Sequence, residues 1–238
     1  MRSKTVKKDC RLLTLGCIPY AETWQLQQDI AAARREGSCQ DTLILVEHLS
    51  VFTLGRSGTR ANVKVADEVL AKAGLEVIEV DRGGDITYHG PGQLVGYPII
   101  DLRGYKQDLH YYAYLLEEVI IRTLADYSIT GYREAGLTGV WTGRGKIAAI
   151  GIGARGWVTM HGFAVNIDPD MSYFSLINPC GITGRPVVSM RELGVAAGVE
   201  EVAGRLIQQF AAVFGVTFSS LDGKLLWAAV SGRCGGRE

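Results

Sequence analysis

The stretch TGVWTGRGKIAAIGIGARGWVTMHGFAVNI, residues Thr138–Ile167, consists of short apolar runs that are separated by glycines. Runs of this kind are typical of β-strands, and the glycines between them supply the backbone conformations that tight hairpin turns require. The stretch therefore predicts consecutive antiparallel strands joined by short turns.

Two glycine patterns within this stretch resemble nucleotide-binding motifs. Glycines at 151, 153 and 156 match G-x-G-x-x-G, but in a dinucleotide site a helix follows the glycines and faces the pyrophosphate. Here the segment WVTMHGFAVNI follows, and its pattern predicts a strand, so we interpret the glycines as part of a hairpin. The segment before Lys146 has Val140 where a phosphate loop needs its first glycine and Ile147 where it needs Ser or Thr. We expect no ATP site here.

The segments on either side predict a mixed α/β domain. Helices are expected near 20–35, near 66–73, directly after Asp108 and near 199–214, and strands near 11–15, at 42–47 and at 76–80. Asp108 can act as the N-cap of its helix. One face of that helix is predicted to be buried, formed by Leu109, Tyr112, Leu116, Val119, Ile120 and Thr123, and its aromatic residues are expected in the core. Because no linker divides the chain, we expect residues 1–238 to form a single α/β domain with a mixed, largely antiparallel sheet and flanking helices.

Composition excludes several classes of partner. The 238 residues are 47% apolar, which is enough for a full core, and 25 basic residues balance 25 acidic ones. No overall field therefore draws the protein to nucleic acid or to a membrane surface. The apolar run at 12–18 is interrupted by Thr14 and Gly16 and stopped by Pro19, so it does not resemble a signal peptide. No run approaches the roughly 18 residues that span a bilayer. We expect a soluble protein with no nucleic-acid or membrane partner.

The cysteines indicate a reducing environment. There are five, Cys10, Cys17, Cys39, Cys180 and Cys234, and no two form a C-x-x-C pair. This odd number argues against a disulfide framework, and the spacing argues against a zinc site. We therefore expect no metal and a cytoplasmic location.

Cys180 differs from the other cysteines in its surroundings. It lies in SLINPCGITG, between Pro179 and Gly181, in a segment predicted to be a loop, where reactive groups are commonly displayed. A free cysteine is more often a small buried hydrophobe, and an ordinary thiol needs a cationic neighbour to be a ready nucleophile. Lys146 is the candidate, because a charged amine before the apolar residues 147–150 is costly to bury unless it is paired. The alternative is a lysine that simply reaches water.

The segment RGGDITYHGPGQ, residues 82–93, concentrates an arginine, a histidine and four glycines directly after a predicted strand. Glycines let a ligand lie against the backbone, so the segment can form one wall of a substrate pocket. It can also be a long turn in which Arg82 and His89 are surface groups. His161, beside Gly162 at the start of another predicted strand, is open to the same two interpretations.

Four segments in this order, RGGDITYHGPGQ, GVWTGRGKIAAIGIG, HGFAVNI and INPCGI, resemble the lipoyl(octanoyl) transferases, also called the lipoate-protein ligase B family. The resemblance covers about residues 40–195. It implies the α/β fold of biotin and lipoate ligase catalytic domains, Cys180 and Lys146 as catalytic residues, and no cofactor. One departure is Val188, where the family usually has a threonine. The resemblance also implies a set of residues around the acyl chain, which are Arg82, Gly83, Gly84, Asp85, Ile86, Thr87, Tyr88, His89, Ala149, Ile150, Gly151, His161, Gly162, Phe163 and Ala164.

The resemblance implies a two-step acyl transfer. Octanoyl-acyl carrier protein would give its acyl group to Cys180, and a lysine ε-amine on a lipoyl domain would take it, in the first step of lipoate assembly. The acceptors would be the lipoyl domains of 2-oxoacid dehydrogenases and the glycine cleavage H protein. Because such partners are typically acidic, we expect docking at a local basic patch around Arg56, Arg60 and Lys64. The alternatives are an ATP-dependent lipoate or biotin ligase, a catalytically silent acyl- or lipoyl-binding protein, and a thioesterase-like hydrolase.

Overall fold

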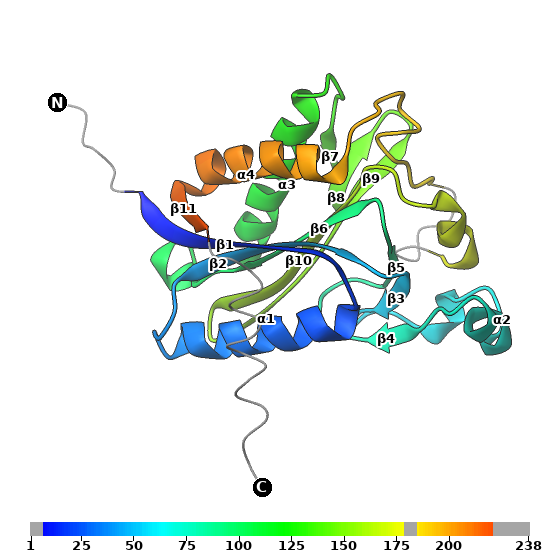
Figure 1. Ribbon diagram of the computed structural model, residues 1–238, viewed down its shortest axis with the longest axis horizontal. Helices are drawn as coiled ribbons and strands as arrows, with labels where there is room; N and C mark the ends of the chain where they lie inside the picture. Colours follow the sequence, from blue (N-terminus) through cyan, green and yellow to red (C-terminus); the bar gives the residue numbers. More distant parts are fainter. Residues whose placement is uncertain (1–6, 179–184, 221–238) are drawn as a thin grey trace, which may run out of the picture.

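The computed structural model describes residues 7–178 and 185–220 and is built around one large mixed sheet (Figure 1). In this sheet β1 runs parallel to both of its neighbours, whereas the remaining pairs are antiparallel. The predicted mixed, largely antiparallel sheet is therefore confirmed. In spatial order its strands are β11 (Val216–Ser220), β1 (Lys8–Ile18), β2 (Asp41–His48), β6 (Gln93–Ile99), β10 (Val158–Asn166), β9 (Gly145–Arg155), β8 (Leu137–Thr142) and β7 (Tyr132–Glu134).

Helices cover both faces of this sheet. In Figure 1, α3 (Leu109–Ala125) and α4 (Val199–Phe214) lie on one face and α1 (Tyr20–Arg35) lies on the other. Side chains alternate between the faces of a strand, so a central strand must be apolar on both. In β2, Leu43 and Leu45 belong to the apolar cluster with α3 and α4, while Ile44 and Val46 belong to the cluster with α1. Alternate side chains of the run TLILVE thus belong to two apolar clusters, one on each face of the sheet.

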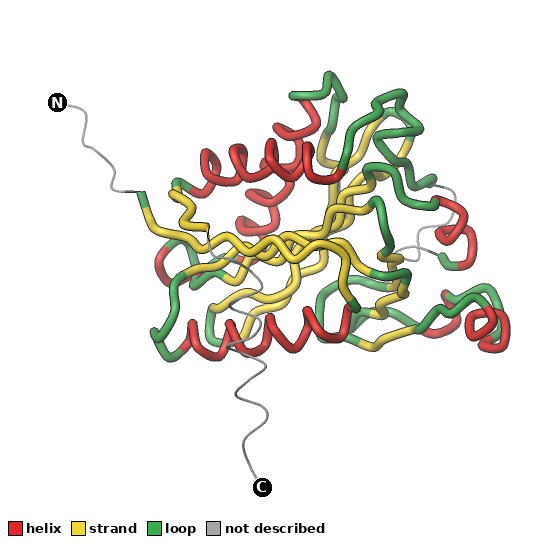
Figure 2. Tube along the Cα trace, viewed as in Figure 1, coloured by secondary structure: helices red, strands yellow, loops and turns green. Residues whose placement is uncertain are grey.

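A second sheet of three strands lies beside the first, in the order β4 (Val77–Glu79), β3 (Val51–Leu54) and β5 (Ile86–His89). Figure 2 shows its strands in yellow near one end of the large sheet. Two short helical segments accompany it, α2 (Asp67–Lys72) and the 3-10 helix η3 (Met171–Leu176), while η1 (Arg60–Asn62) and η2 (Leu102–Gly104) are further 3-10 turns. The backbone N–H of Gly83 donates to the carbonyl of Ile152 in β9 at 2.8 Å. This contact holds the glycine-rich segment against the large sheet.

Most of the predicted elements are confirmed. The helices at 20–35 and 199–214 have the predicted bounds, and the Asp108 carboxylate accepts the N–H of Tyr111 at 3.0 Å as the N-cap of α3. The glycines at 151 and 153 lie within β9, and a two-residue turn leads into β10. Gly156 and Trp157 form this turn with φ of 59° and 65°, the positive values that a type I′ hairpin requires. The hairpin interpretation was therefore correct.

The prediction for the aromatic face of α3 was partly wrong. Tyr112 is buried, but Tyr111 and Tyr114 are 42% and 47% exposed, and Leu109 is 36% exposed. The rings of Tyr111 and Tyr114 stack on each other with centroids 6.3 Å apart, and the Arg133 guanidinium lies 3.8 Å from the Tyr114 centroid. These two rings therefore contact each other and the Arg133 guanidinium at the surface and do not pack in the core. The buried face of α3 begins at Tyr112.

Among the helices that the structure describes, none combines the length and the apolar character needed to cross a bilayer.

Cys10, Cys17 and Cys39 are free thiols.

A substitution at Gly162 tests how closely β10 and β6 approach each other. A Cβ at Gly162 would overlap the carbonyl oxygen of Gly96 and press against the ring of Pro98. We expect Gly162→Ala to lower the free energy of unfolding by about 1–3 kcal/mol, because backbone must move to admit the methyl group. Urea denaturation with a linear extrapolation measures the change.

The matched control is Gly204→Ala in α4, where an added Cβ meets nothing within 4 Å. It should raise the free energy of unfolding by roughly 0.5–1 kcal/mol, as expected for alanine in place of a helix-interior glycine. Equal stabilisation by both substitutions would contradict the close approach at Gly162.

Candidate active site

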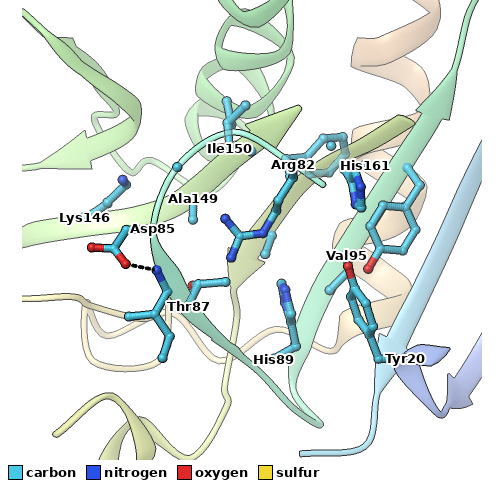
Figure 3. A pocket seen from close by; sticks show the side chains of 17 residues that line it. Tyr20, Arg82, Asp85, Thr87, His89, Val95, Lys146, Ala149, Ile150 and His161 are labelled. Atoms are coloured by element: carbon cyan, nitrogen blue, oxygen red, sulfur yellow. Dashed lines mark hydrogen bonds between the residues drawn. The ribbon is translucent and has the colours of Figure 1, made fainter. Parts of the chain in front are cut away.

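A narrow pocket of about 50 Å³ lies where the small sheet meets β9, β10 and the start of α1 (Figure 3). Lys146 and most of the predicted acyl-chain residues surround it. The predicted residues that line it are Arg82, Gly84, Asp85, Ile86, Thr87, His89, Lys146, Ala149, Ile150, Gly151, His161, Gly162, Phe163 and Ala164. The fold thus brings three of the four sequence motifs to one place.

Tyr88 and Gly83 do not line the pocket. The ring of Tyr88 packs in the small apolar cluster against Phe52, with the Tyr173 ring stacked at a centroid distance of 4.8 Å. Its hydroxyl lies 3.0 Å from Ser50 Oγ. Successive side chains of a strand point to opposite faces, so when Thr87 and His89 line the pocket, Tyr88 between them turns away. The interpretation of 82–89 as one continuous wall overlooked this alternation.

Cys180 lies outside the described residues, but the chain on either side of it can be followed. The N–H of Asn178 donates to the carbonyl of Asn62 at 2.8 Å. On the other side, the carbonyl of Pro186 accepts the backbone N–H of Lys146 at 2.9 Å. Pro186, six positions after Cys180 in the sequence, therefore lies directly beside Lys146.

Lys146 is buried within β9 and is only 8% exposed. Its backbone is fixed on both sides, since its N–H donates to Pro186 and its carbonyl accepts the N–H of Val188 at 2.9 Å. Nζ lies 5.3 Å from the ring centroid of Trp141, within range of a cation–π interaction. A Cβ on Gly139, where φ is 126°, would overlap the lysine side chain. The glycine in GVWTG thus makes room for the amine.

Two buried histidines form the polar end of the pocket region. His48 and His89 have ring centroids 5.8 Å apart, and the Tyr20 ring stacks on His89 at 5.8 Å. Burial lowers the pKa of His48 to about 4 and that of His89 to about 3. Both rings are therefore neutral near neutral pH. His48 Nδ1 donates to the carbonyl of Ile18 at 3.0 Å, so its Nε2 accepts from the Tyr97 hydroxyl at 2.7 Å.

His161 lines the pocket (Figure 3) and contacts the Asp81 carboxylate, which lies outside the pocket lining. Its Nε2 is 2.6 Å from Asp81 Oδ1, and its backbone N–H donates to Gln27 Oε1 at 2.9 Å. The φ angle of 57° is unusual for a residue other than glycine, and these two contacts hold it. Burial lowers the pKa of His161, and the hydrogen bond to Asp81 opposes that effect.

Arg82 reaches into the middle of the pocket (Figure 3) and is 7% exposed. Its Nη2 donates to the carbonyl of Thr53 at 2.7 Å and to Thr53 Oγ1 at 2.9 Å, and Nη1 donates to the carbonyl of Gly83 at 3.1 Å. These bonds orient the guanidinium across β3. Arg82 is therefore a fixed internal group, not the surface residue of the alternative interpretation.

Sequence reasoning missed three lining residues, Tyr20, Val95 and Tyr97. They come from α1 and β6, which carry no glycine-rich motif. An aromatic residue at the first position of a helix gives no signal by itself. Only the packing of α1 across the sheet brings Tyr20 to the pocket.

The predicted basic patch is exposed but already has acidic neighbours. Arg60 Nη2 lies 2.7 Å from Asp67 Oδ1, and Arg56 Nη2 lies 4.0 Å from Asp81 Oδ2. Its role in docking stays a prediction. Within residues 7–178 and 185–220, no cluster of three or more His, Cys, Asp or Glu side chains is arranged to hold a metal ion.

Comparisons with known proteins bear on the family and on the fold. Residues 19–211 match the family model described as the lipoyl protein ligase A/B catalytic domain. An octanoyltransferase from Solibacter usitatus is 50% identical over 222 residues, which cover 93% of this chain and 100% of the relative. One from Gloeobacter violaceus is 49% identical over 208 residues, covering 87% and 91%. The crystal structure of lipoate-protein ligase A bound with ATP superposes with a TM-score of 0.74 at 18% identity, covering 94% of this chain and 95% of that one. The predicted fold class is confirmed.

The buried histidines make stability depend on pH. Unfolded histidines take up protons near pH 6.5, whereas His48 and His89 stay neutral down to about 4 and about 3. The unfolded state therefore binds more protons in this range, so the free energy of unfolding should be highest above pH 6.5 and should fall as the pH drops towards 4. Urea denaturation at a series of pH values measures it.

In His89→Gln the slope between pH 6.5 and 4 should decrease, by up to about 1.4 kcal/mol per pH unit for one proton. The control His110→Gln removes an exposed imidazole from α3 and should leave the slope unchanged. Identical slopes in the parent and in His89→Gln would show that His89 is not buried in its neutral form.

Proposed function

The chain belongs to the octanoyltransferases of the lipoyl protein ligase A/B catalytic-domain family, and we propose that it moves the octanoyl group through a thioester on Cys180. It is an acyltransferase of lipoate biosynthesis, as the sequence motifs predicted. In our proposal the donor is octanoyl-acyl carrier protein. The acceptors are lysine ε-amines on the lipoyl domains of 2-oxoacid dehydrogenases and on the glycine cleavage H protein.

The observation that carries the proposal is the position of Lys146. Its side chain is buried at the pocket, and its backbone is bonded to Pro186, which follows Cys180 by six residues in the sequence. Six residues span at most about 20 Å, so the thiol is within reach of this end of the pocket. A buried ammonium group beside a thiol stabilises the thiolate and can also exchange protons.

The reaction balances without ATP. The Cys180 thiolate attacks the octanoyl carbonyl carbon, an S–C bond forms, and the bond to the phosphopantetheine sulfur breaks. Lys146 gives its proton to that leaving thiolate. In the second step the acceptor amine attacks the Cys180 thioester, Lys146 takes a proton from the amine, and the Cys180 thiolate leaves. A thioester is exchanged for a more stable amide, so no further energy source is required.

The three cysteines that the structure describes are poorly suited to this chemistry. Cys10 is 1% exposed, and burial raises its pKa to about 12. Burial also raises the pKa of Cys17, with a contribution from Glu47, and that of Cys39. A thiol that ionises less readily is a poorer nucleophile at neutral pH. These free thiols also support our placement of the enzyme in the reducing cytoplasm.

The pocket offers the acyl chain two kinds of surface. Ala149, Ile150 and Gly151 on β9 are paired in the sheet with Ala164, Phe163 and Gly162 on β10, and these small or apolar residues suit a hydrocarbon. On the opposite side, Gly84 has a φ of 86° and leaves the backbone bare. We propose that the acyl chain lies between these two surfaces, with its carbonyl group at the end of the pocket where Lys146 lies.

Intact mass measurement tests the covalent step. Incubation with octanoyl-acyl carrier protein should add one octanoyl group, and addition of a lipoyl domain should move that group to the domain. Peptide mapping should find the octanoyl group on Cys180, and Cys180→Ser should transfer none. Octanoate on Cys10, Cys17, Cys39 or Cys234 during competent transfer would refute the assignment. A control with free octanoate and ATP should give no product.

Substitutions at Lys146 separate charge from proton transfer. Arginine keeps a positive charge but does not lose its proton, so it cannot accept one from the incoming amine. We expect Lys146→Arg to keep the alkylation of Cys180 by iodoacetamide but to lose transfer to the lipoyl domain. Lys146→Ala should lose transfer and shift the pH midpoint of alkylation upward by about one unit or more, each unit being about 1.4 kcal/mol of lost thiolate stabilisation.

Lys106→Ala is the matched control, because the Lys106 side chain is 62% exposed and pairs with Asp108 away from the pocket. It should leave transfer and alkylation as in the parent. If the alkylation profile of Lys146→Ala overlays that of the parent, Lys146 is not the partner of the thiol.

A further inference from the structure

A chain of buried polar side chains runs from Arg82 in the pocket to the segment beside Lys146. We infer that Asn166, the last residue of β10, is a positioning residue for Lys146, acting through the backbone of residues 186–188. The inference rests on the proposed role of Lys146 in proton transfer. It gives a function to the end of the HGFAVNI segment, to which the resemblance assigned none.

Asn166 holds the segment that holds Lys146. Its Nδ2 donates to the carbonyl of Val188 at 3.1 Å, and its backbone carbonyl accepts the N–H of Met190 at 2.9 Å. The same segment pairs with β9, since Lys146 donates to Pro186 and accepts from Val188. Residues 186–188 are thus fixed between Lys146 on one side and Asn166 on the other.

A second amide fixes the orientation of Asn166. Gln93 is 1% exposed, and its Nε2 donates both to Asn166 Oδ1 at 2.9 Å and to the carbonyl of Tyr88 at 3.1 Å. Because Nε2 is the donor, Gln93 Oε1 must accept, and it lies 2.7 Å from His89 Nδ1. His89 therefore carries its proton on Nδ1.

The chain continues in one direction to the pocket. With its proton on Nδ1, His89 accepts at Nε2, which is 3.3 Å from the hydroxyl of Thr53. That hydroxyl oxygen in turn accepts from Arg82 Nη2 at 2.9 Å. A guanidinium can only donate and a carbonyl can only accept, so Arg82 and Val188 define the two ends. Each group between them donates to the next, and reversal of one amide would break two bonds.

These amides and Lys146 also share a cavity. A void of about 20 Å³ adjoins the pocket, and Gln93, Lys146, Asn166 and Val187 are among the residues that line it. A buried amide that loses its partner there is costly, because the desolvation of its polar atoms is no longer offset by a protein hydrogen bond. The side chain of Lys146 is therefore sensitive to the orientation of Asn166 as well as to the backbone of 186–188.

The substitution Asn166→Asp tests this with almost no change in shape. It replaces the donor at Nδ2 by an ionised oxygen that faces the carbonyl of Val188, and the two acceptors repel each other. Residues 186–188 should move away from β10 and displace Lys146, and a misplacement of about 1 Å can cost on the order of 100-fold in rate. We expect kcat to fall by about 10- to 100-fold while KM for octanoyl-acyl carrier protein changes by less than about threefold.

Two readouts separate positioning from a merely structural role. The pH midpoint of Cys180 alkylation should shift upward, in the direction of Lys146→Ala. The ratio of variant to parent activity should also rise as the pH is lowered, because the introduced carboxyl becomes protonated and can again donate to Val188. The matched control is Thr123→Val in α3, which removes a buried hydrogen bond of 2.8 Å to the carbonyl of Val119. It should lower stability and leave the alkylation midpoint unchanged.

If Lys146→Ala shifts the midpoint but folded Asn166→Asp overlays the parent, Asn166 does not position Lys146 and the proposed function stands. If Lys146→Ala itself has no effect, the role of Lys146 fails and this inference fails with it. Should Asn166→Asp not fold, Gln93→Met removes the bond that orients Asn166 and must give the same upward shift. An unshifted midpoint in Gln93→Met would overturn the inference.

Discussion

The buried side-chain amine of Lys146 is the constraint on which the arrangement of this site depends. A charged amine that is 8% exposed within a sheet loses hydration worth on the order of several kcal/mol. The surrounding residues lower that cost in specific ways. Gly139 leaves space for the side chain, the Trp141 ring offers its face, and the backbone of 186–188 is bonded to β9 on both sides of the lysine.

The glycines of the site allow the glycine-rich segment 82–84 to approach the large sheet closely. Gly151 and Gly162 face each other across β9 and β10, and a Cβ on Gly151 would meet the side chain of Arg82 and the carbonyl of Gly83. The segment 82–84 can therefore pack directly on the sheet and place its arginine inside the pocket. Motifs that are far apart in the sequence are thus parts of one contact, in which the glycine-rich segment and the hairpin fit against each other.

Local sequence patterns predicted the elements well because those elements are decided locally. The cap at Asp108, the hairpin at Gly156 and the helix at 199–214 depend on residues within a few positions of each other. The pocket could be predicted only in part. Tyr20 lines the pocket because α1 packs across the sheet. Tyr88 points away from the pocket because side chains alternate along β5, a pattern that is hard to recognise in a glycine-rich segment. The resemblance implied catalytic roles for Cys180 and Lys146, which stay predictions, and gave no role to Gln93 and Asn166. The hydrogen bonds of Gln93 and Asn166 join residues 73 and 22 positions apart in the chain, so local sequence patterns do not reveal them.

The shared fold does not determine the reaction. Lipoate-protein ligase A, whose crystal structure contains ATP, has the same fold at 18% identity, so the fold by itself does not identify the ligands of this chain. In the proposed mechanism the donor thioester is already activated, so the protein has to supply only a nucleophile and a proton carrier. In the proposed mechanism this demand falls on Lys146, which must both give and take a proton at the pocket. The hydrogen-bond chain suits this proposal, since the groups that lie between Arg82 and the carbonyl of Val188 are neutral and each has a fixed direction of donation.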